Sequence, residues 1–358
     1  MRVVIAPDSF KGSLGAEDVA EAIAAGWLSE RPDDELTLLP QADGGEGTLD
    51  AIEASIPGAE RHSAGAVTGP DGRATPGEWL QLPDGSAVVE LAQASGLPLM
   101  AAPDAARATT RGTGEVIRRA LEAGASSLVL ALGGSASTDG GAGALAALGL
   151  RLLGLRGRPI ADGGAALASL ETIDRSALLP PPAGGVTLLT DVTNPLLGPT
   201  GAARTFGPQK GASAVECAEL DAALARWARL LGGAPDAPGA GAAGGTGYGF
   251  AALWGARIEP GAPRIAQLTG LVAAVASADL VITGEGRFDA QSLAGKVVGH
   301  VLGLHPWVAI IAGAIAAPTP GWSASLTELA GSAERAMADP DRWLRDVGAR
   351  AARELSRS

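Results

Sequence analysis

The sequence contains a single cysteine, Cys217, among its 358 residues. One thiol cannot form an internal disulfide, and it cannot supply a metal site built from several thiolates. Long apolar runs are missing too, because even the stretch 307–317 is shorter than a membrane span. We therefore interpret Cys217 as a small buried residue and expect no membrane association.

Basic side chains are in the minority. Lysine and arginine total 27 against 39 aspartates and glutamates, which gives a net charge of −12. This balance speaks against nucleic acid or an anionic membrane as the main partner. The N-terminus begins on a predicted strand, with Asp8 and Lys11 where a signal peptide needs its apolar centre. We expect a cytoplasmic globular protein that is long enough for two domains.

Several catalytic signatures are absent. The chain has no G-x-x-x-x-G-K-[ST] phosphate loop and no G-x-S-x-G nucleophile turn. His62, His300 and His305 show no metal-ligand spacing, which disfavours a triad hydrolase or a histidine-bound zinc enzyme. Within the glycine-rich segment 232–249, residues 239–244 match G-x-G-x-x-G, but no predicted strand precedes them. We therefore expect the segment 232–249 to be a flexible loop, with a lid or a close-packed turn as the alternatives.

Lysine is scarce, and its positions are informative. The only lysines are Lys11, Lys210 and Lys296, and each is next to a glycine. Lysine differs from arginine as a phosphate ligand because it carries a compact point charge on a flexible stem. The pattern indicates that ammonium groups are needed in these turns, although coincidence in a glycine-rich chain remains the alternative.

The segment 128–143, LVLALGGSASTDGGAG, shows the pattern that organises the chain. An apolar run bounded by glycine predicts a buried strand, followed by a tight turn and then a helix that begins near Ala142. The start of a helix offers unpaired N–H groups that suit a phosphate. A glycine-rich turn that binds nothing is the alternative.

The same pattern recurs along the chain. Five other apolar runs end in turns with glycine or polar residues, at 3–6, 36–39, 186–189, 280–283 and 308–312. Ligands of open α/β sheets bind outside the carboxyl ends of the strands. We therefore predict an enzyme in which these turns meet in one cleft.

Turn signals occur at 70–72 and 83–85, and two segments of strand length, 77–82 and 86–91, flank the second one, which predicts an antiparallel hairpin. The strands and helices at the two ends of the chain predict one doubly wound sheet. We therefore predict an α/β protein with a discontinuous domain, 1–65 and 275–358, and an inserted α/β domain, 66–274, that includes antiparallel strands.

The turns present carboxylates together with the scarce lysines. The carboxylates are Asp8, Asp43, Glu46, Asp139, Asp191, Glu285 and Asp289. Phosphoryl transfer needs Mg²⁺ held by carboxylates, cations on the transferred group, backbone donors and a carboxylate for the acceptor proton. Acidic loops that converge without a cation would repel one another and an anionic ligand. Lysine together with Mg²⁺ resolves that conflict.

These turns resemble motifs of the bacterial glycerate kinase family along nearly the whole chain. The matching segments are DSFKGSL at 8–14, ADGGEGT at 42–48, GGSA at 133–136, DGGAG at 139–143, FGPQKGA at 206–212 and ITGEGR at 282–287. The resemblance implies a split flavodoxin-like domain and ATP-dependent phosphorylation of D-glycerate with Mg²⁺, usually to 2-phosphoglycerate. A kinase of a related hydroxy acid and a non-catalytic sensor of a sugar acid or nucleotide are the alternatives.

Under this hypothesis we assign catalytic, ligand-binding and metal-binding roles to residues of these turns. The candidate catalytic residues are Asp191, Lys11, Lys210 and Asp43. The candidate substrate- and phosphate-binding residues are Ser9, Gly44, Gly45, Glu46, Gly133, Gly134, Ser135, Asn194, Gln209, Glu285, Arg287 and Lys296. The candidate metal ligands are Asp139 and Asp289. Asp191 directly follows a strand and is our candidate general base; a carboxylate that caps its own turn is the alternative. The sequence leaves open whether the chain forms a homodimer.

Overall fold

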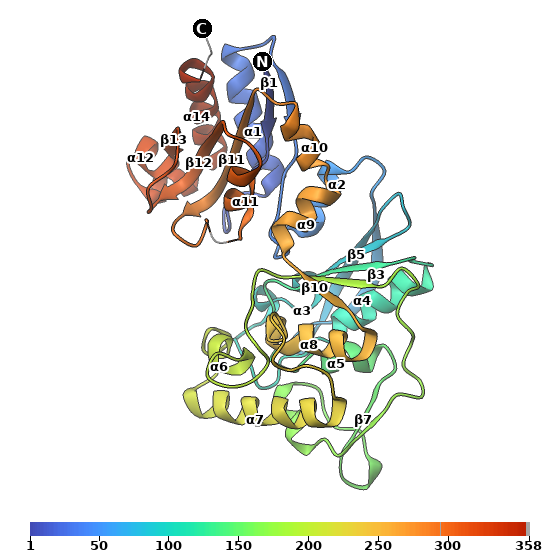
Figure 1. Cartoon of the computed structure of the whole chain (residues 1–358). Helices are drawn as coiled ribbons and strands as arrows, with labels where there is room; N and C mark the ends of the chain where they lie inside the picture. The colour runs from blue at the N-terminus through green and yellow to red at the C-terminus, as the bar shows by residue number, and fades with distance from the viewer. Residues whose placement is uncertain (294, 356–358) are drawn as a thin grey trace. The chain divides into compact units, whose positions relative to one another are not determined.

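The computed structural model of the chain (Figure 1) describes residues 1–293 and 295–355. The chain divides into two compact units. Unit 1 comprises Met1–Asp43, Asp50–Pro57 and the chain from Pro260 onward. Unit 2 comprises Gly44–Leu49 and Gly58–Glu259. These divisions come earlier than the predicted boundaries near residues 65 and 275.

Unit 1 is built on a five-stranded parallel sheet. Its strands are β1 (Arg2–Ile5), β2 (Glu35–Leu38), β11 (Leu280–Phe288), β12 (Val308–Ile315) and β13 (Ser323–Ser325). The strand order is β13-β12-β11-β1-β2. Counted within the unit this is 2-1-3-4-5, the flavodoxin-like order of a doubly wound sheet. The predicted fold class is confirmed.

Helices cover both faces of this sheet. They are α1 (Ala16–Glu30), α2 (Thr48–Ser55, whose first two residues are counted in unit 2), α9 (Gly261–Leu268), α10 (Leu271–Ala276), α11 (Val297–Leu304), α12 (Leu326–Ala330), α13 (Ala333–Ala338) and α14 (Pro340–Glu354). Successive strand residues point to opposite faces. Val3 and Ile5 therefore share a core with α1 and α14, whereas Val4 shares one with α9, α10 and α11. Because α9 and α10 lie in unit 1, the second division precedes residue 275.

Two glycines determine how closely α1 and α14 approach. A Cβ atom at Gly26 would overlap the backbone carbonyl of Arg345, and one at Gly348 would overlap that of Ile23. Each helix thus presents a glycine to the backbone of the other. Trp27, on the same helix as Gly26, is completely buried in the core below this contact.

Unit 2 is built on a six-stranded mixed sheet. Its strands are β3 (Glu60–Thr68), β4 (Ala74–Gln81), β5 (Ala87–Glu90), β6 (Leu128–Ala131), β9 (Val186–Leu189) and β10 (Arg257–Glu259). The order is β10-β9-β6-β5-β4-β3, with β3, β4 and β5 joined antiparallel and the others parallel. The predicted hairpin is therefore present. β3 pairs with β4, so residues 60–65 belong to unit 2.

Helices and a small second sheet complete unit 2. The α-helices are α3 (Leu91–Ser95), α4 (Arg111–Glu122), α5 (Ala142–Ala147), α6 (Ala202–Phe206), α7 (Ala214–Leu231) and α8 (Ala242–Trp254). The 3₁₀ helices are η1 (Leu97–Leu99), η2 (Leu155–Gly157), η3 (Gly164–Ser169) and η4 (Pro208–Lys210). β7 (Arg151–Leu153) pairs with β8 (Thr172–Asp174). The helix that we predicted from Ala142 thus ends at Ala147, before β7 begins.

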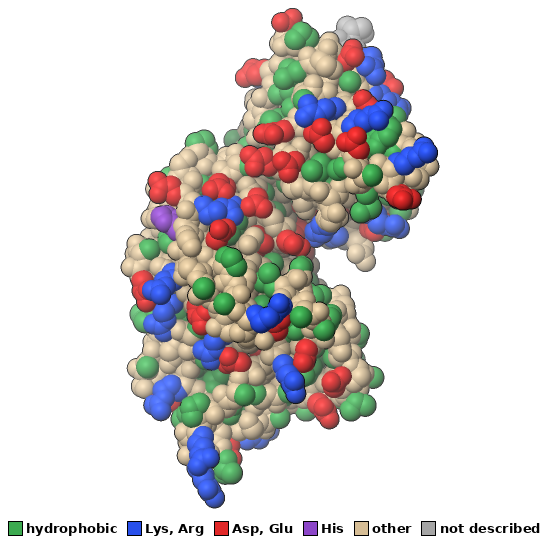
Figure 2. Space-filling model, turned by 180° about the vertical axis from the view of Figure 1, so that it is seen from behind, with side chains coloured by type: hydrophobic (Ala, Val, Ile, Leu, Met, Phe, Trp, Pro, Cys, Tyr) green, Lys and Arg blue, Asp and Glu red, His purple; other side chains and the backbone are tan. Residues whose placement is uncertain are grey.

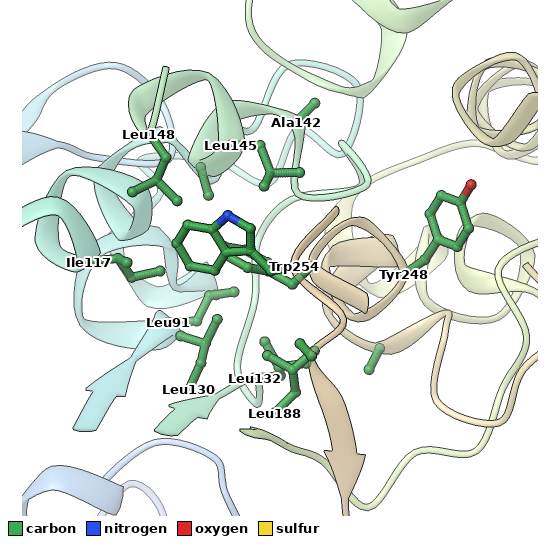
Figure 3. Packing of buried hydrophobic residues seen from close by; sticks show 14 of the residues in the cluster. Leu91, Ile117, Leu130, Leu132, Ala142, Leu145, Leu148, Leu188, Tyr248 and Trp254 are labelled. Atoms are coloured by element: carbon green, nitrogen blue, oxygen red, sulfur yellow. The ribbon is translucent and has the colours of Figure 1, made fainter. Parts of the chain in front are cut away.

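The core of unit 2 gathers around helix α8 (Figure 3). Figure 3 shows the indole of Trp254 among Leu91, Ile117 and Leu145, which come from three other helices. Its Nε1 atom donates a hydrogen bond to the backbone oxygen of Leu179 at 3.0 Å, so the buried polar atom is satisfied.

The prediction of a glycine-rich loop at 232–249 is right for residues 232–241, which lie outside helices and strands, and wrong for residues 242–249, which belong to α8. The first turn of α8 is left-handed, with positive φ angles at Ala243, Gly244 and Gly245. A Cβ atom at Gly244 would overlap the backbone oxygen of Ser137. The glycines therefore allow α8 to pack directly against the organising segment 128–143.

Strand β11 is longer than predicted. We expected a turn after Thr283, but the strand continues to Phe288, and Glu285 pairs with Ala312 of β12. Glycines here permit close backbone contact and do not make a turn. A Cβ atom at Gly284 would overlap the carbonyl of Ile311.

The surface carries both signs of charge. Figure 2 shows acidic and basic side chains interspersed over the face that it presents. Throughout the described part of the chain, each helix is too short or too polar to cross a lipid bilayer.

Candidate active site

Unit 1 contains a cavity of about 390 Å³ at the carboxyl ends of β1 and β11. Seven predicted site residues line it: Ser9, Lys11, Asp43, Glu285, Arg287, Asp289 and Lys296. Asp8, which the sequence analysis counted among the carboxylates, lines it as well. Segments far apart in the sequence meet here because β1 and β11 are neighbouring parallel strands.

The loop after β1 is held by the middle of β11. The backbone N–H of Asp8 donates to the carbonyl of Gly284 at 2.8 Å. Phe10 is buried and exchanges backbone hydrogen bonds with Leu14, which closes a tight turn with Gly12 at a φ of 79°. This turn places Ser9 and Lys11 on the cavity.

The electrostatics of this pocket are dominated by crowded acids. Burial, together with the charge of Asp43, raises the pKa of Asp8 to about 7, although the charge of Lys11 opposes the shift. Burial also raises the pKa of Glu285. Among the described residues no hydrogen-bond partner reaches the buried Oε1 atom of Glu285. The site therefore favours a cation beside its carboxylates.

The oxygen donors of this pocket suit an Mg²⁺ ion that is bound jointly by the protein and by substrate phosphates. In the described part of the chain no three acidic, histidine or cysteine side chains converge to hold a metal by themselves. Mg²⁺ does not require such a cage, because it is commonly bound by one or two carboxylates, several waters and substrate phosphates. Asp8, Asp43 and Asp289 provide oxygen donors in the pocket.

Unit 2 contains a second cavity, of about 330 Å³, at the carboxyl ends of β6 and β9. Six predicted residues line it: Glu46, Gly133, Gly134, Ser135, Gln209 and Lys210. Sequence reasoning missed Leu97, Pro98, Thr190, Val192, Phe206 and Ala243. Phe206 could have been found, because it begins the FGPQKGA motif. Leu97 and Pro98 follow no strand directly and gave no signal.

Lys210 is the buried cation of the unit 2 pocket, with 3% of its surface exposed. Its Nζ atom donates to Ser135 Oγ at 2.8 Å and to the backbone oxygen of Ser137 at 2.6 Å. Burial lowers the pKa of Lys210 to about 7, and the charge of Asp139 acts in the opposite direction. The lysine therefore joins η4 to the glycine-rich loop after β6.

Gly44 and Gly45 support the same loop through their backbone. The N–H of Gly133 donates to the carbonyl of Gly44 at 2.9 Å. A Cβ atom at Gly133 would overlap the Cα of Gly45. The glycines of the two motifs thus pack against each other, and Glu46 follows them on the cavity wall.

Asp139 has a structural arrangement that the sequence analysis did not foresee. Its carboxylate is completely buried and accepts hydrogen bonds from the N–H and hydroxyl of Thr110 and from the N–H groups of Gly141 and Gly143. The expected anion site at this helix start is therefore filled by the protein's own carboxylate. We do not retain Asp139 as a metal ligand.

Asp191 and Asn194 lie in the loop after β9. Thr190 and Val192, on either side of Asp191, line the unit 2 pocket, and Asp191 itself is half-buried. Asn194 Nδ2 donates to the carbonyl of Thr200 at 2.7 Å. This bond fixes the loop and gives Asn194 a structural contact.

Comparisons with known proteins identify the family of the chain. Residues 3–356 match the model of the glycerate kinase family. The chain is 46% identical to glycerate 2-kinase of Escherichia coli K12 over 306 residues, which cover 83% of this chain and 80% of the relative. It is 44% identical to glycerate kinase of Bacillus subtilis 168 over 305 residues, or 83% of this chain and 79% of the relative.

A solved structure extends the comparison to the fold. A crystal structure from Salmonella typhimurium LT2, described as a glycerate kinase 2, superposes with a TM-score of 0.83 at 38% identity. The match covers 99% of this chain and 98% of that one. The chain therefore belongs to the glycerate kinase family and is a phosphotransferase of the class whose acceptor is an alcohol group.

Proposed function

We propose that this protein phosphorylates D-glycerate with ATP as the donor and Mg²⁺ as the metal, and that the product is 2-phosphoglycerate. The observation that carries the proposal is the 46% identity to a glycerate 2-kinase over 83% of the chain. The three lysines support it, because Lys11 and Lys296 line the pocket of unit 1 and Lys210 lines the pocket of unit 2.

The cations of unit 1 suit a transferring phosphoryl group. Lys11, Arg287 and Lys296 line one pocket together with Asp8 and Asp43. One or two of the carboxylates Asp8, Asp43 and Asp289, together with water and the substrate phosphates, would hold Mg²⁺. The bound ion neutralises charge on phosphate oxygens and orients them. Glu285 is a buried acid that lines the same pocket, and burial raises its pKa, so a cation beside it would favour its charged form.

The pocket of unit 2 offers donors for a carboxylate or phosphate. Lys210, Ser135 and Gln209 line it, and the glycine-rich loop brings its backbone to the cavity. Lys210 remains fully charged only below its lowered pKa, so a bound anion would also favour its ammonium form.

Asp191 is the proposed general base towards the acceptor hydroxyl. Its neighbours Thr190 and Val192 both line the unit 2 pocket, which supports this role. A carboxylate that accepts the hydroxyl proton as the phosphoryl group arrives contributes typically about 10²–10⁴-fold to such a step.

A coupled assay of ADP release with MgATP and D-glycerate tests the proposal. Turnover that requires both D-glycerate and Mg²⁺ is the expected result, and ³¹P NMR of the product should show phosphate on the 2-hydroxyl. A panel of other hydroxy acids is the control. Faster turnover of another acid would identify a different acceptor, and ligand binding without ADP release would identify a sensor.

A further inference from the structure

The pocket of unit 1 has two walls of different chemistry. One wall is charged and comes from the loop after β1 and the end of β11, with Lys11 and Arg287. The other is apolar and comes from α12 and α13, with Leu326, Ala336 and Met337. Neither the motifs nor the predicted roles included this apolar wall.

Met337 is unusual on this wall because 60% of its surface is exposed, whereas Leu326 and Ala336 are buried. An exposed methionine on the wall of a cavity provides apolar contact to a ligand and adapts to its shape. A ligand that covers Met337 would remove this surface from water, which stabilises the complex.

The sheet order places this pocket at a topological switch point. From β1 the chain continues to β2 on one side, whereas β11 is followed by β12 on the other side. The carboxyl ends of β1 and β11 therefore border the crevice where doubly wound sheets bind their ligands. In the flavodoxin-like order 2-1-3-4-5, that crevice holds a flavin nucleotide.

The two substrates of the proposed reaction differ in how much apolar surface they can bury against the protein. Each carbon of glycerate carries an oxygen, so an apolar wall gains little from it. A purine nucleotide has an anionic phosphate end and a flat base with a large apolar face. It therefore matches a pocket that has cations on one wall and Leu326, Ala336 and Met337 on another.

We infer that the unit 1 pocket binds the nucleotide, with the phosphates at Lys11, Arg287 and Lys296 and the purine base against Leu326, Ala336 and Met337. This inference rests on the proposed function and assigns one of its two substrates to a pocket. It agrees with the hydrogen bonds that the N–H groups of Gly141 and Gly143 donate to the carboxylate of Asp139. Because these N–H groups are already bonded, they cannot form the phosphate site that we expected at the start of α5.

Binding of MgADP to the full-length protein without glycerate tests the inference by calorimetric titration. Met337→Ser should raise the Kd of MgADP about tenfold, which corresponds to the loss of about 1.4 kcal/mol. Met337→Leu should restore the affinity to within about twofold, because methionine and leucine have similar volumes. Inorganic tripolyphosphate lacks the base, so its Kd should not change in Met337→Ser.

Phe206→Ala is the matched control, because Phe206 is an apolar residue that lines the unit 2 pocket. It should leave the Kd of MgADP unchanged. The inference is overturned if Phe206→Ala weakens MgADP while Met337→Ser does not, if Met337→Ser weakens tripolyphosphate as much as MgADP, or if the wild-type protein binds no nucleotide.

The two proposals fail in distinguishable ways. If wild-type protein and variants bind MgADP as expected but glycerate gives no turnover, the proposed function fails and the nucleotide site stands. If glycerate is phosphorylated while Met337→Ser retains its nucleotide affinity, only the site assignment fails. A melting curve of Met337→Ser verifies that the fold is intact.

Discussion

Asp8 is a buried carboxyl group, and burial together with the charge of Asp43 raises its pKa to about 7. An unfolded chain releases the same proton near pH 4. Between these values the folded state binds more protons than the unfolded state, so stability falls as the pH rises. Above about pH 7 the full cost of the buried charge is present.

Asp8→Asn should therefore stabilise the ligand-free protein at pH 8 by at least about 1 kcal/mol, and the gain should disappear near pH 4. The Asn side chain keeps an oxygen for the N–H of Ser9, which Asp8 Oδ1 accepts at 2.6 Å. Denaturant unfolding in EDTA at both pH values measures the difference. An equal effect at pH 4 and pH 8 would contradict the assigned ionisation.

Asp191→Asn tests the proposed base. We expect kcat to fall by about 10²–10⁴-fold, because the amide cannot accept the proton of the acceptor hydroxyl. Steady-state kinetics measure the loss, and the melting temperature should stay within a few degrees of the wild type. A loss of less than tenfold would transfer the role to Asp43 or Asp8.

At the scale of the element, the α1–α14 pair depends on two glycines. Gly26→Ala normally favours a helix by up to about 1 kcal/mol. Here the new Cβ would overlap the carbonyl of Arg345, so the two helices must separate. We expect a net destabilisation of about 1–3 kcal/mol.

Gly303→Ala is the matched control, because Gly303 lies in α11 with no atom within 4 Å of an added Cβ. It should be neutral or stabilising. Chemical denaturation of both variants gives the comparison. Equal free energies of unfolding for Gly26→Ala and the wild type would show that the α1–α14 contact can relax without cost.

At the scale of the whole molecule, each unit buries its own core. We therefore expect two transitions in scanning calorimetry, because proteins with separate cores commonly depart from two-state unfolding. Gly26→Ala should lower the temperature of one transition by several degrees and leave the other unchanged. A single transition that shifts as a whole would show that the units unfold cooperatively.

Local patterns were sufficient for much of this protein. Apolar runs such as 128–132 and 186–189 gave buried strands because a strand needs only a short apolar segment between breakers. The glycine-flanked lysines identified Lys11 and Lys210 as pocket residues without any structure. The sheet that joins both ends of the chain was also predicted, since its strands share one pattern.

The role of several glycines could not be predicted from the sequence, because it depends on which backbone atoms of distant segments pack against them. In β11, Gly284 permits close strand pairing, and in α8, Gly244 permits contact with the loop after β6, yet both positions resemble turns in the sequence. Asp139 is a similar case. A carboxylate in a glycine-rich loop suggests a ligand site, but burial and four hydrogen bonds satisfy it internally.

The sequence by itself determined the residue types, the strand and helix pattern and the resemblance that led to the function, since these are properties of short segments and their order. The tertiary structure decided which turns line a common pocket and added the apolar wall of Leu326, Ala336 and Met337. That wall follows from how α12 and α13 pack near the ends of β1 and β11. No local pattern in the sequence encodes such a contact between distant segments.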